Sequence, residues 1–377
     1  MKHLIIVLVA VLCAPSLTSA WWPRGHATIT DAAVQATPEV PGFFKAGAAH
    51  IAHMTADPDV ARNWGTPLAS AAEHGEHYID IEMLEGRELP ARRYEFIDLC
   101  YELGIKPPHV GLVPYAVSEW TERLALAFAE HRKWPDNPVI KSKCLTIAGN
   151  VAHYAQDMTQ PLHLTIHFNG RPDPDKTLDE GDTIYGSFQA IDGKGEVVPG
   201  AEPEDRRVQI GDRRANADLS KALLGIKLGE SRDVSYSETL EDGGNRTVHF
   251  RVTANRIQEQ RGLHEKIDGL PLTLEMTADQ LAEGIVVAPA DSLMEEVIAH
   301  VKRGFALVDR AYELGPNMPR HGQEGWERDE EVVTFAIERA KEAARFTASM
   351  FLTAWKRSET IELPGWLDRG PEPAEHE

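Results

Sequence analysis

Four long stretches with the periodicity of amphipathic helices constrain the fold of this chain most strongly. They cover residues 113–133, 138–158, 290–315 and 329–357, and they are rich in alanine and leucine with charged residues on one face. The region 168–262 is different, because much of the glycine, proline and charge of the chain gathers there. The sequence therefore predicts a mainly α-helical protein whose helical body is interrupted by a β-containing insertion.

Two segments of the insertion have the alternation of polar and apolar residues that is typical of β-strands. In both, the alternating residues flank a glycine-containing turn: GSFQAI-DGKG-EVV at 186–198 and DVSYSETL-EDGGN-RTVHFRV at 233–252. We interpret each segment as a β-hairpin.

The N-terminal segment MKHLIIVLVAVLCAPSLTSA has the three parts of a secretory signal peptide. Lys2 supplies the positive start, an apolar run follows, and small residues precede a cut between Ala20 and Trp21. The apolar run is too short to span a membrane, so we expect a secreted or periplasmic protein without a stable membrane span. Cleavage would leave three parts. The helical domain covers 21–167 and 263–357, the insertion covers 168–262, and a disordered tail covers 358–377.

The net charge of the chain limits how it can bind an anionic partner. The chain carries 59 acidic and 39 basic side chains, a net charge of −20. Removal of the predicted leader takes away Lys2 and no acidic residue, so the mature chain has a net charge of −21. A phosphate-rich partner held mainly by counterion release requires a basic surface. An anionic substrate would therefore be held locally, by a metal ion or a few arginines.

Two cysteines remain after the leader, Cys100 and Cys144. They could pair in an oxidising compartment, but one bridge does not make a disulfide scaffold. The length of 377 residues instead allows a large hydrophobic core.

A first group of residues with the spacing of metal ligands lies at the end of the helix predicted over 138–158. His153 and Asp157 are four residues apart, so they share one face of that helix. Pro161 ends the helix and turns the chain, which can bring His163 back towards the same point.

Other segments add candidate ligands to this group. His264 and Asp268 repeat the spacing of four in GLHEKID, while His77 in EHYID and Asp59 in ADPDVAR lie upstream. One such pair on a helix is usually only a hydrogen-bonded surface pair. Zinc, however, needs nitrogen and oxygen ligands that converge from rigid elements, and the two pairs together with His163 supply them. The whole set therefore favours a metal site.

In this combination the sequence resembles the trinuclear-zinc phosphodiester hydrolases, which comprise the single-strand-specific nucleases of fungi and plants and the zinc-dependent phospholipases C of bacteria. The resemblance implies a multi-helix fold of the phospholipase C and nuclease type. The 153–163 motif is the most specific part of it. The motifs follow the family's order: Trp21 with Gly25-His26, Asp-x-x-Arg at 59–62, His-Tyr-x-Asp at 77–80, His-x-x-x-Asp-x-x-Gln-Pro-Leu-His at 153–163 and Leu-His-x-x-x-Asp at 263–268.

The resemblance implies three zinc ions per chain. The third zinc would be held by the free α-amine and carbonyl oxygen of Trp21, with His26 and a shared Asp157. Asp57 competes with Asp59 within DPD, and Asp59 is preferred because it keeps the spacing to Arg62. In order, the implied ligand sets are Asp59, His77, His153 and Asp157; His163, His264 and Asp268; and Trp21, His26 and Asp157.

The resemblance also implies contacts with a substrate. Arg62 would clamp a phosphate, because a guanidinium matches the geometry of phosphate oxygens; a structural ion pair is the alternative for this residue. Tyr78 would stack on a base and Asp80 would hydrogen-bond that base, with core packing as the alternative for Tyr78. Asp59 would also accept a proton from the attacking water.

Two features favour the nuclease branch of the family, and two weigh against it. Trp21 and His26 are five residues apart with a Gly-His pair, and GGN at 243–245 resembles the turn that precedes the last His-x-x-x-Asp of nucleases. The acidic net charge and the long segment between His163 and this turn are unlike the nuclease pattern.

We therefore expect a zinc-dependent endonuclease that cleaves single-stranded DNA or RNA by a zinc-activated hydroxide. A phospholipase C that acts on phospholipid head groups is the alternative enzyme. A non-catalytic zinc-binding protein, in which the insertion caps the metals, is the alternative outside catalysis. No motif in the sequence indicates an oligomeric state.

Overall fold

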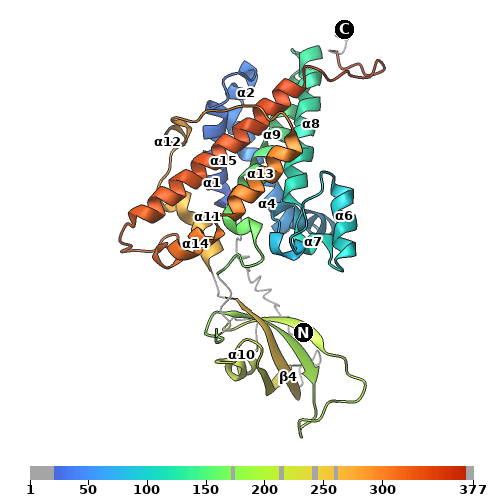
Figure 1. Ribbon diagram of the computed structural model, residues 1–377, viewed down its shortest axis with the longest axis vertical. Helices are drawn as coiled ribbons and strands as arrows, with labels where there is room; N and C mark the ends of the chain where they lie inside the picture. Colours follow the sequence, from blue (N-terminus) through green and yellow to red (C-terminus); the bar gives the residue numbers. More distant parts are fainter. Residues whose placement is uncertain (1–20, 171–174, 212–215, 240–244, 259–261, 371–377) are drawn as a thin grey trace, which may run out of the picture.

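The fold is seen in a computed structural model (Figure 1), which describes residues 21–170, 175–211, 216–239, 245–258 and 262–370. Within these residues the protein is mainly helical with one small antiparallel sheet, so the predicted fold class is confirmed. The predicted signal peptide and the end of the predicted tail (371–377) lie outside the described residues.

Short helices form most of the N-terminal part of the helical body. Their bounds are α1 (Trp22–Gln35), α2 (Gly42–Ala46), α3 (Ala48–Met54), α4 (Asp57–Trp64), α5 (Pro67–Glu73), η1 (His74–His77), η2 (Ile81–Leu84), α6 (Arg93–Glu102) and α7 (Pro107–Val110).

Three long helices, α8 (Val113–Lys133), α9 (Pro138–Asp157) and α15 (Glu330–Arg357), pack against one another at the centre of the body (Figure 1). All three were expected from periodicity, and their bounds agree with the prediction to within one residue. Asn137 fixes the start of α9, because its side chain accepts hydrogen bonds from the backbone N–H groups of Val139 and Ile140. The remaining elements of the body are η3 (Pro161–Leu164), α11 (Leu263–Thr273), α12 (Ala278–Ala282), α13 (Leu293–Phe305), α14 (Val308–Leu314) and η4 (Gly315–Asn317).

The prediction of a single helix over 290–315 is wrong, because the chain turns at Ala306 and Leu307 between α13 and α14. Both helices contact η3, which one straight helix of that length could not do. Gly304 makes the close approach possible, since a Cβ there would lie 2.6 Å from Leu164 Cδ1. Periodicity alone carries no sign of such a turn.

A four-stranded antiparallel sheet with the order β2-β1-β4-β3 forms the centre of the insertion. The helix α10 contacts β3 and buries Leu219 and Leu223 with the hydrophobic residues of one sheet face. Within the described residues, the buried hydrophobic side chains of the insertion form a cluster separate from that of the helical body. The elements are β1 (Thr183–Ala190), β2 (Glu204–Gln209), α10 (Ala217–Leu223), β3 (Ser231–Thr239) and β4 (Asn245–Gln258).

The second predicted hairpin is confirmed, since β3 pairs with β4 from Ser231↔Thr253 to Thr239↔Asn245; its turn at 240–244 lies outside the described residues. The first is only partly correct. The turn forms as expected, with a hydrogen bond of 2.8 Å from Asp192 N to Glu196 O. Beyond it, the return strand is reduced to one bridge, and β1 pairs instead with β2 and β4.

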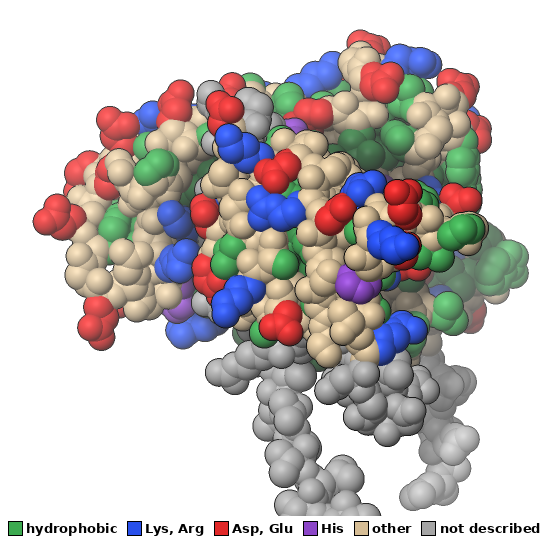
Figure 2. Space-filling view, turned by 90° about the horizontal axis from the view of Figure 1, so that it is seen from below, with side chains coloured by type: hydrophobic (Ala, Val, Ile, Leu, Met, Phe, Trp, Pro, Cys, Tyr) green, Lys and Arg blue, Asp and Glu red, His purple; other side chains and the backbone are tan. Residues whose placement is uncertain are grey.

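The insertion leaves the helical body after η3 and returns at α11 (Figure 1). Seen from the end of the molecule that carries the sheet, Lys and Arg side chains are interspersed with Asp and Glu (Figure 2). No helix in the described ranges is both long and apolar enough to cross a membrane. Cys100 and Cys144 are buried thiols and do not form a disulfide with each other.

Candidate metal centre

Histidine and aspartate side chains from α1, α4, η1, α9, η3 and α11 meet inside the helical body. They form three groups in which one ligand atom per residue lies within 4.8 Å of the others. All members are buried except His264, which is partly exposed. The groups are His26, His153 and Asp157; Asp59, His77 and His153; and His163, His264 and Asp268.

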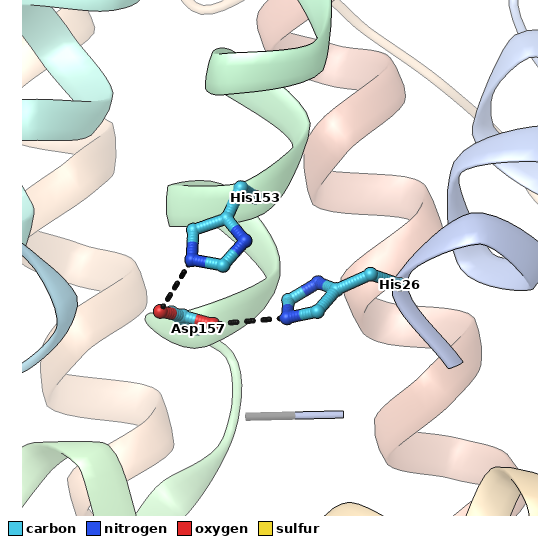
Figure 3. A group of neighbouring side chains, drawn as sticks. All are labelled: His26, His153 and Asp157. Carbon is cyan, nitrogen blue, oxygen red and sulfur yellow. Dashed lines mark ion pairs between the residues drawn. The ribbon is translucent and has the colours of Figure 1, made fainter. Parts of the chain in front are cut away.

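The carboxylate of Asp157, at the end of α9, joins the first two groups. Its Oδ1 lies 3.4 Å from His26 Nε2, and its Oδ2 lies 3.2 Å from His153 Nε2 and 2.9 Å from His77 Nδ1. Figure 3 shows His26 approaching from α1 while the other two residues project from α9. Because both oxygens of Asp157 face histidines, this carboxylate would offer an oxygen ligand to a cation in either of these two groups.

Asp59 and His77 bring the second group together with His153. His77 Nδ1 lies 3.0 Å from His153 Nε2 and 4.0 Å from Asp59 Oδ1. Asp59 is only 3% exposed, whereas the neighbouring Asp57 is exposed to solvent. The structure therefore places Asp59, and not Asp57, beside the histidines.

The third group is formed by two stacked imidazoles and a carboxylate. The rings of His163 and His264 have centroids 4.7 Å apart, and His264 Nδ1 lies 3.1 Å from Asp268 Oδ2. Burial lowers the pKa of His163 to about 4. Burial, followed by repulsion from His163 when that ring is protonated, holds the pKa of His264 well below its usual range. Both rings are therefore neutral near pH 7, which is the state that a metal requires.

Hydrogen bonds to backbone carbonyls fix the tautomers of two ligand histidines. Nδ1 of His153 donates to the Thr55 carbonyl at 2.8 Å, and Nδ1 of His163 donates to the His77 carbonyl at 2.6 Å. A carbonyl only accepts, so Nδ1 carries a proton and Nε2 holds the lone pair whenever the ring is neutral. That lone pair then faces the centre of its group, as in proteins that hold zinc through histidine.

Several inward-facing atoms are buried without a hydrogen bond from any described residue: His26 Nε2, Asp157 Oδ1, His163 Nε2 and Asp268 Oδ2. Leaving such an atom unsatisfied costs about 1–3 kcal/mol. One bound cation in each group would satisfy them, because imidazole nitrogens and carboxylate oxygens are metal ligands. The buried groups therefore fit metal ions.

The same packing shifts the pKa values of the central pair when no cation is bound. Burial lowers the pKa of His153, but attraction by Asp157 and Asp59 outweighs burial and raises this pKa to about 9. Burial raises the pKa of Asp157, yet the charge of His153 and the close approach of His153, His26 and His77 hold it well below its usual range. A metal ion that binds here must therefore displace a proton from His153.

The backbone of Trp21 lies between two of the groups. Its carbonyl oxygen accepts from the backbone N–H of His26 at 3.0 Å, and its own N–H donates to the Asp268 carboxylate. The indole is fully buried, and its Nε1 donates to the Gln156 carbonyl at 3.0 Å. The side chain thus anchors the backbone atoms that, according to the motif resemblance, would hold a third zinc.

An extra residue before Trp21 is expected to cost the bound metal beside His26 and most of the activity. A peptide N–H cannot donate a lone pair to a metal, whereas a free α-amine can. Zinc content and turnover of the processed protein should be compared with those of a form that keeps one additional methionine. Equal zinc and equal activity in both forms would remove Trp21 from the ligand set.

Arg62 on α4 lies near the third group. Burial is the main cause of the lowered pKa values of His163, His264 and His74, and the positive charge of Arg62 lowers them further. This side chain is partly buried, and its charge also acts on Tyr78. Arg62 is thus close enough to the third group for its charge to act on both of its histidines.

The two predicted base contacts lie on the segment that follows η1. The hydroxyl of Tyr78 donates to the Pro108 carbonyl at 2.7 Å, which fixes the ring half-exposed at the surface. Burial raises the pKa of Tyr78 to about 12, so it stays neutral. Asp80 is 8% exposed, and burial together with Glu82 raises its pKa to about 7, although Arg256 opposes this shift.

Glu73, which was not singled out in the sequence, and Gln160, which was quoted only as part of the 153–163 motif, support the groups. Glu73 accepts a hydrogen bond from Tyr154 and lies 3.5 Å from His77 Nε2, which orients Nδ1 of His77 towards the centre. Its spacing of four from His77 was a usable signal. Gln160 Nε2 donates to Asp268 Oδ1 at 2.9 Å, which leaves Oδ2 facing the histidines.

Replacement of Gln156 by alanine is expected to weaken metal binding about 10- to 100-fold. Gln156 Oε1 accepts from His26 Nδ1 at 2.8 Å while its Nε2 donates to Thr30 Oγ1 at 2.8 Å, so the amide fixes the His26 tautomer. Zinc titration against a competing chelator measures the change. Gln156→Glu keeps the acceptor and should retain more affinity than alanine; the opposite order would contradict this role.

No known family model matches the chain, and no curated protein is significantly similar to it.

Proposed function

We propose that this protein is a secreted zinc-dependent phosphodiesterase that holds three zinc ions and cleaves single-stranded DNA or RNA. The observation that carries the proposal is the convergence of three buried His/Asp groups, two of which share His153 and lie against Asp157. Neighbouring metal ions suit in-line displacement at phosphorus, because they stabilise both the attacking and the leaving oxygen. The motif resemblance supports the number of zinc ions and the nuclease branch.

The side chains of this site have separate tasks in such a reaction. Bound zinc supplies a water of lowered pKa and neutralises phosphate charge. Asp59, beside His77, accepts the proton of the attacking water. Arg62 binds a phosphate oxygen with its guanidinium, and the exposed ring face of Tyr78 supports a base. Because its pKa is about 7, the Asp80 carboxyl is present in both its neutral and its charged form near pH 7, and it hydrogen-bonds that base as a donor or as an acceptor.

One structural observation favours phospholipase C as a second candidate. Val60 and Trp64 on α4 and Leu68 on α5 are 50%, 52% and 86% exposed, and α4 also carries Asp59 and Arg62. Exposed apolar side chains beside a catalytic site are a means of contacting lipid. The substrate must therefore be tested with both classes of phosphodiester.

The test is a substrate panel of single-stranded DNA, single-stranded RNA, phosphatidylcholine vesicles and bis-nitrophenyl phosphate, each with zinc. We expect hydrolysis of the nucleic acids, lost in His153→Ala and kept in His53→Ala, since His53 is an exposed histidine on α3. Cleavage of the lipid alone would select the phospholipase. Bound zinc without hydrolysis of any ester would leave a non-catalytic zinc-binding protein.

A further inference from the structure

One face of the insertion sheet carries a row of three side chains that the proposed reaction does not use. Tyr185 of β1 is in register with Arg207 of β2 and with Arg256 of β4. Paired residues point to the same sheet face, and neighbouring strands are about 4.8 Å apart. The Cζ of Arg256 lies 3.9 Å from the ring centroid of Tyr185. We call these three residues the Arg–Tyr–Arg row.

The row lies on the sheet face opposite α10. Ile184 and Gly186, the neighbours of Tyr185, are buried, and Ile184 belongs to the hydrophobic cluster that contains Leu219 of α10. Since side chains alternate along a strand, Tyr185 points away from α10. Tyr185 and Arg256 are partly exposed, and Arg207 is exposed.

The two arginines of the row differ from other arginines of the sheet. Arg251 is paired with Asp233 at 2.7 Å, and Arg232 is paired with Glu230 at 3.0 Å. The side chains of Arg207 and Arg256 form no ion pair or hydrogen bond with any described residue, and that of Arg256 lies against the Tyr185 ring instead. In a chain with a net charge of −20, these two guanidinium groups are local positive charges that no acidic side chain within the described part of the chain neutralises.

The row lies at the end of the sheet nearest the metal centre. Thr183↔Gln258 is the last pair of β1 and β4, and β4 leads through a short connection to α11, which carries His264. The charge of Arg256 influences the pKa values of both Asp80 and His167 in the helical body. Along the chain, the elements of the insertion follow η3 and precede α11.

We infer that the Arg–Tyr–Arg row binds a single strand of nucleic acid that extends beyond the metal centre, with Arg207 and Arg256 on phosphates and Tyr185 under a base. The inference rests on the proposed function for the class of ligand. Arginine recognises phosphate through paired N–H donors, and an aromatic ring stacks on any base. A membrane surface fits less well, because the outward face around the row carries Ser187, Thr253 and other polar residues.

The test is binding of a labelled, hydrolysis-resistant single strand of about 16 nucleotides, followed by fluorescence anisotropy over a range of salt. Arg207→Gln/Arg256→Gln is expected to weaken binding about 10-fold and to lower the salt slope by about 1.4, since each single-strand phosphate contact contributes about 0.7. Arg251→Gln/Arg328→Gln removes the same charge from paired arginines and should change the slope less. Melting curves confirm that all variants are folded.

The possible outcomes distinguish failure of the Arg–Tyr–Arg row from failure of the proposed nuclease activity. Equal affinity and slope for the Arg207/Arg256 variant and the wild type overturn the inference, even if the protein cleaves nucleic acid. Equal losses in the Arg251/Arg328 control also overturn it, because they show a general charge effect. Binding that depends on the row without any cleavage overturns the proposed nuclease activity and retains the inference.

Discussion

Replacement of Asp157 by asparagine is expected to lower phosphodiesterase activity by about 1000-fold or more. Asp157 is the carboxylate within 3.4 Å of His26, His77 and His153, so its loss affects two of the three groups. An amide has the same shape but carries no charge and cannot bridge two cations through anionic oxygens. Metal content should fall along with kcat/KM.

Asp98→Asn is the matched control for this substitution, because Asp98 is an exposed carboxylate on α6 and the change in net charge is the same. We expect it to keep the zinc and the turnover of the wild type. An Asp157→Asn protein with full zinc and activity within a few fold of the control would show that Asp157 is not a bridging ligand.

Removal of zinc by a chelator is expected to lower the melting temperature by about 10 °C or more. A ligand present at about 1000 times its Kd contributes about 4 kcal/mol to the folded state, and 1 kcal/mol corresponds to about 2–4 °C for chains of some 200 residues. Without cations, the buried atoms His26 Nε2, His163 Nε2 and Asp268 Oδ2 have no hydrogen-bond partner among the described residues.

The measurement is a melting curve with and without chelator, followed by return of zinc. Recovery of the original melting temperature excludes irreversible damage. His153→Ala should show a smaller response to the chelator, because it has less metal to lose. An unchanged melting temperature in wild-type protein whose zinc content has fallen would contradict a metal role in stability.

The helical part of the site could be predicted from sequence because its spacing is local. His153 and Asp157 sit one turn apart on α9, and the fold class followed from the periodicity of that helix and its neighbours. The contact between Asp157 and His26 could not be derived in this way, since it depends on how α1 packs against α9. Only the motif resemblance suggested it.

The supporting hydrogen bonds were beyond reach for a related reason. The sequence assigns no partner to Gln156 or to Gln160, although Gln160 belongs to the 153–163 motif. Their roles arise only when α1 and α11 bring His26 and Asp268 to them. The Arg–Tyr–Arg row likewise depends on the pairing of β1 with β2 and β4, whereas alternation alone suggested a hairpin between adjacent segments.

The metal content of the purified, processed protein tests the central claim most directly. Three zinc ions per chain, measured by elemental analysis after removal of loosely bound metal, is the result that this account predicts. A protein that retains activity with no tightly bound metal, or that binds a single ion, would contradict it.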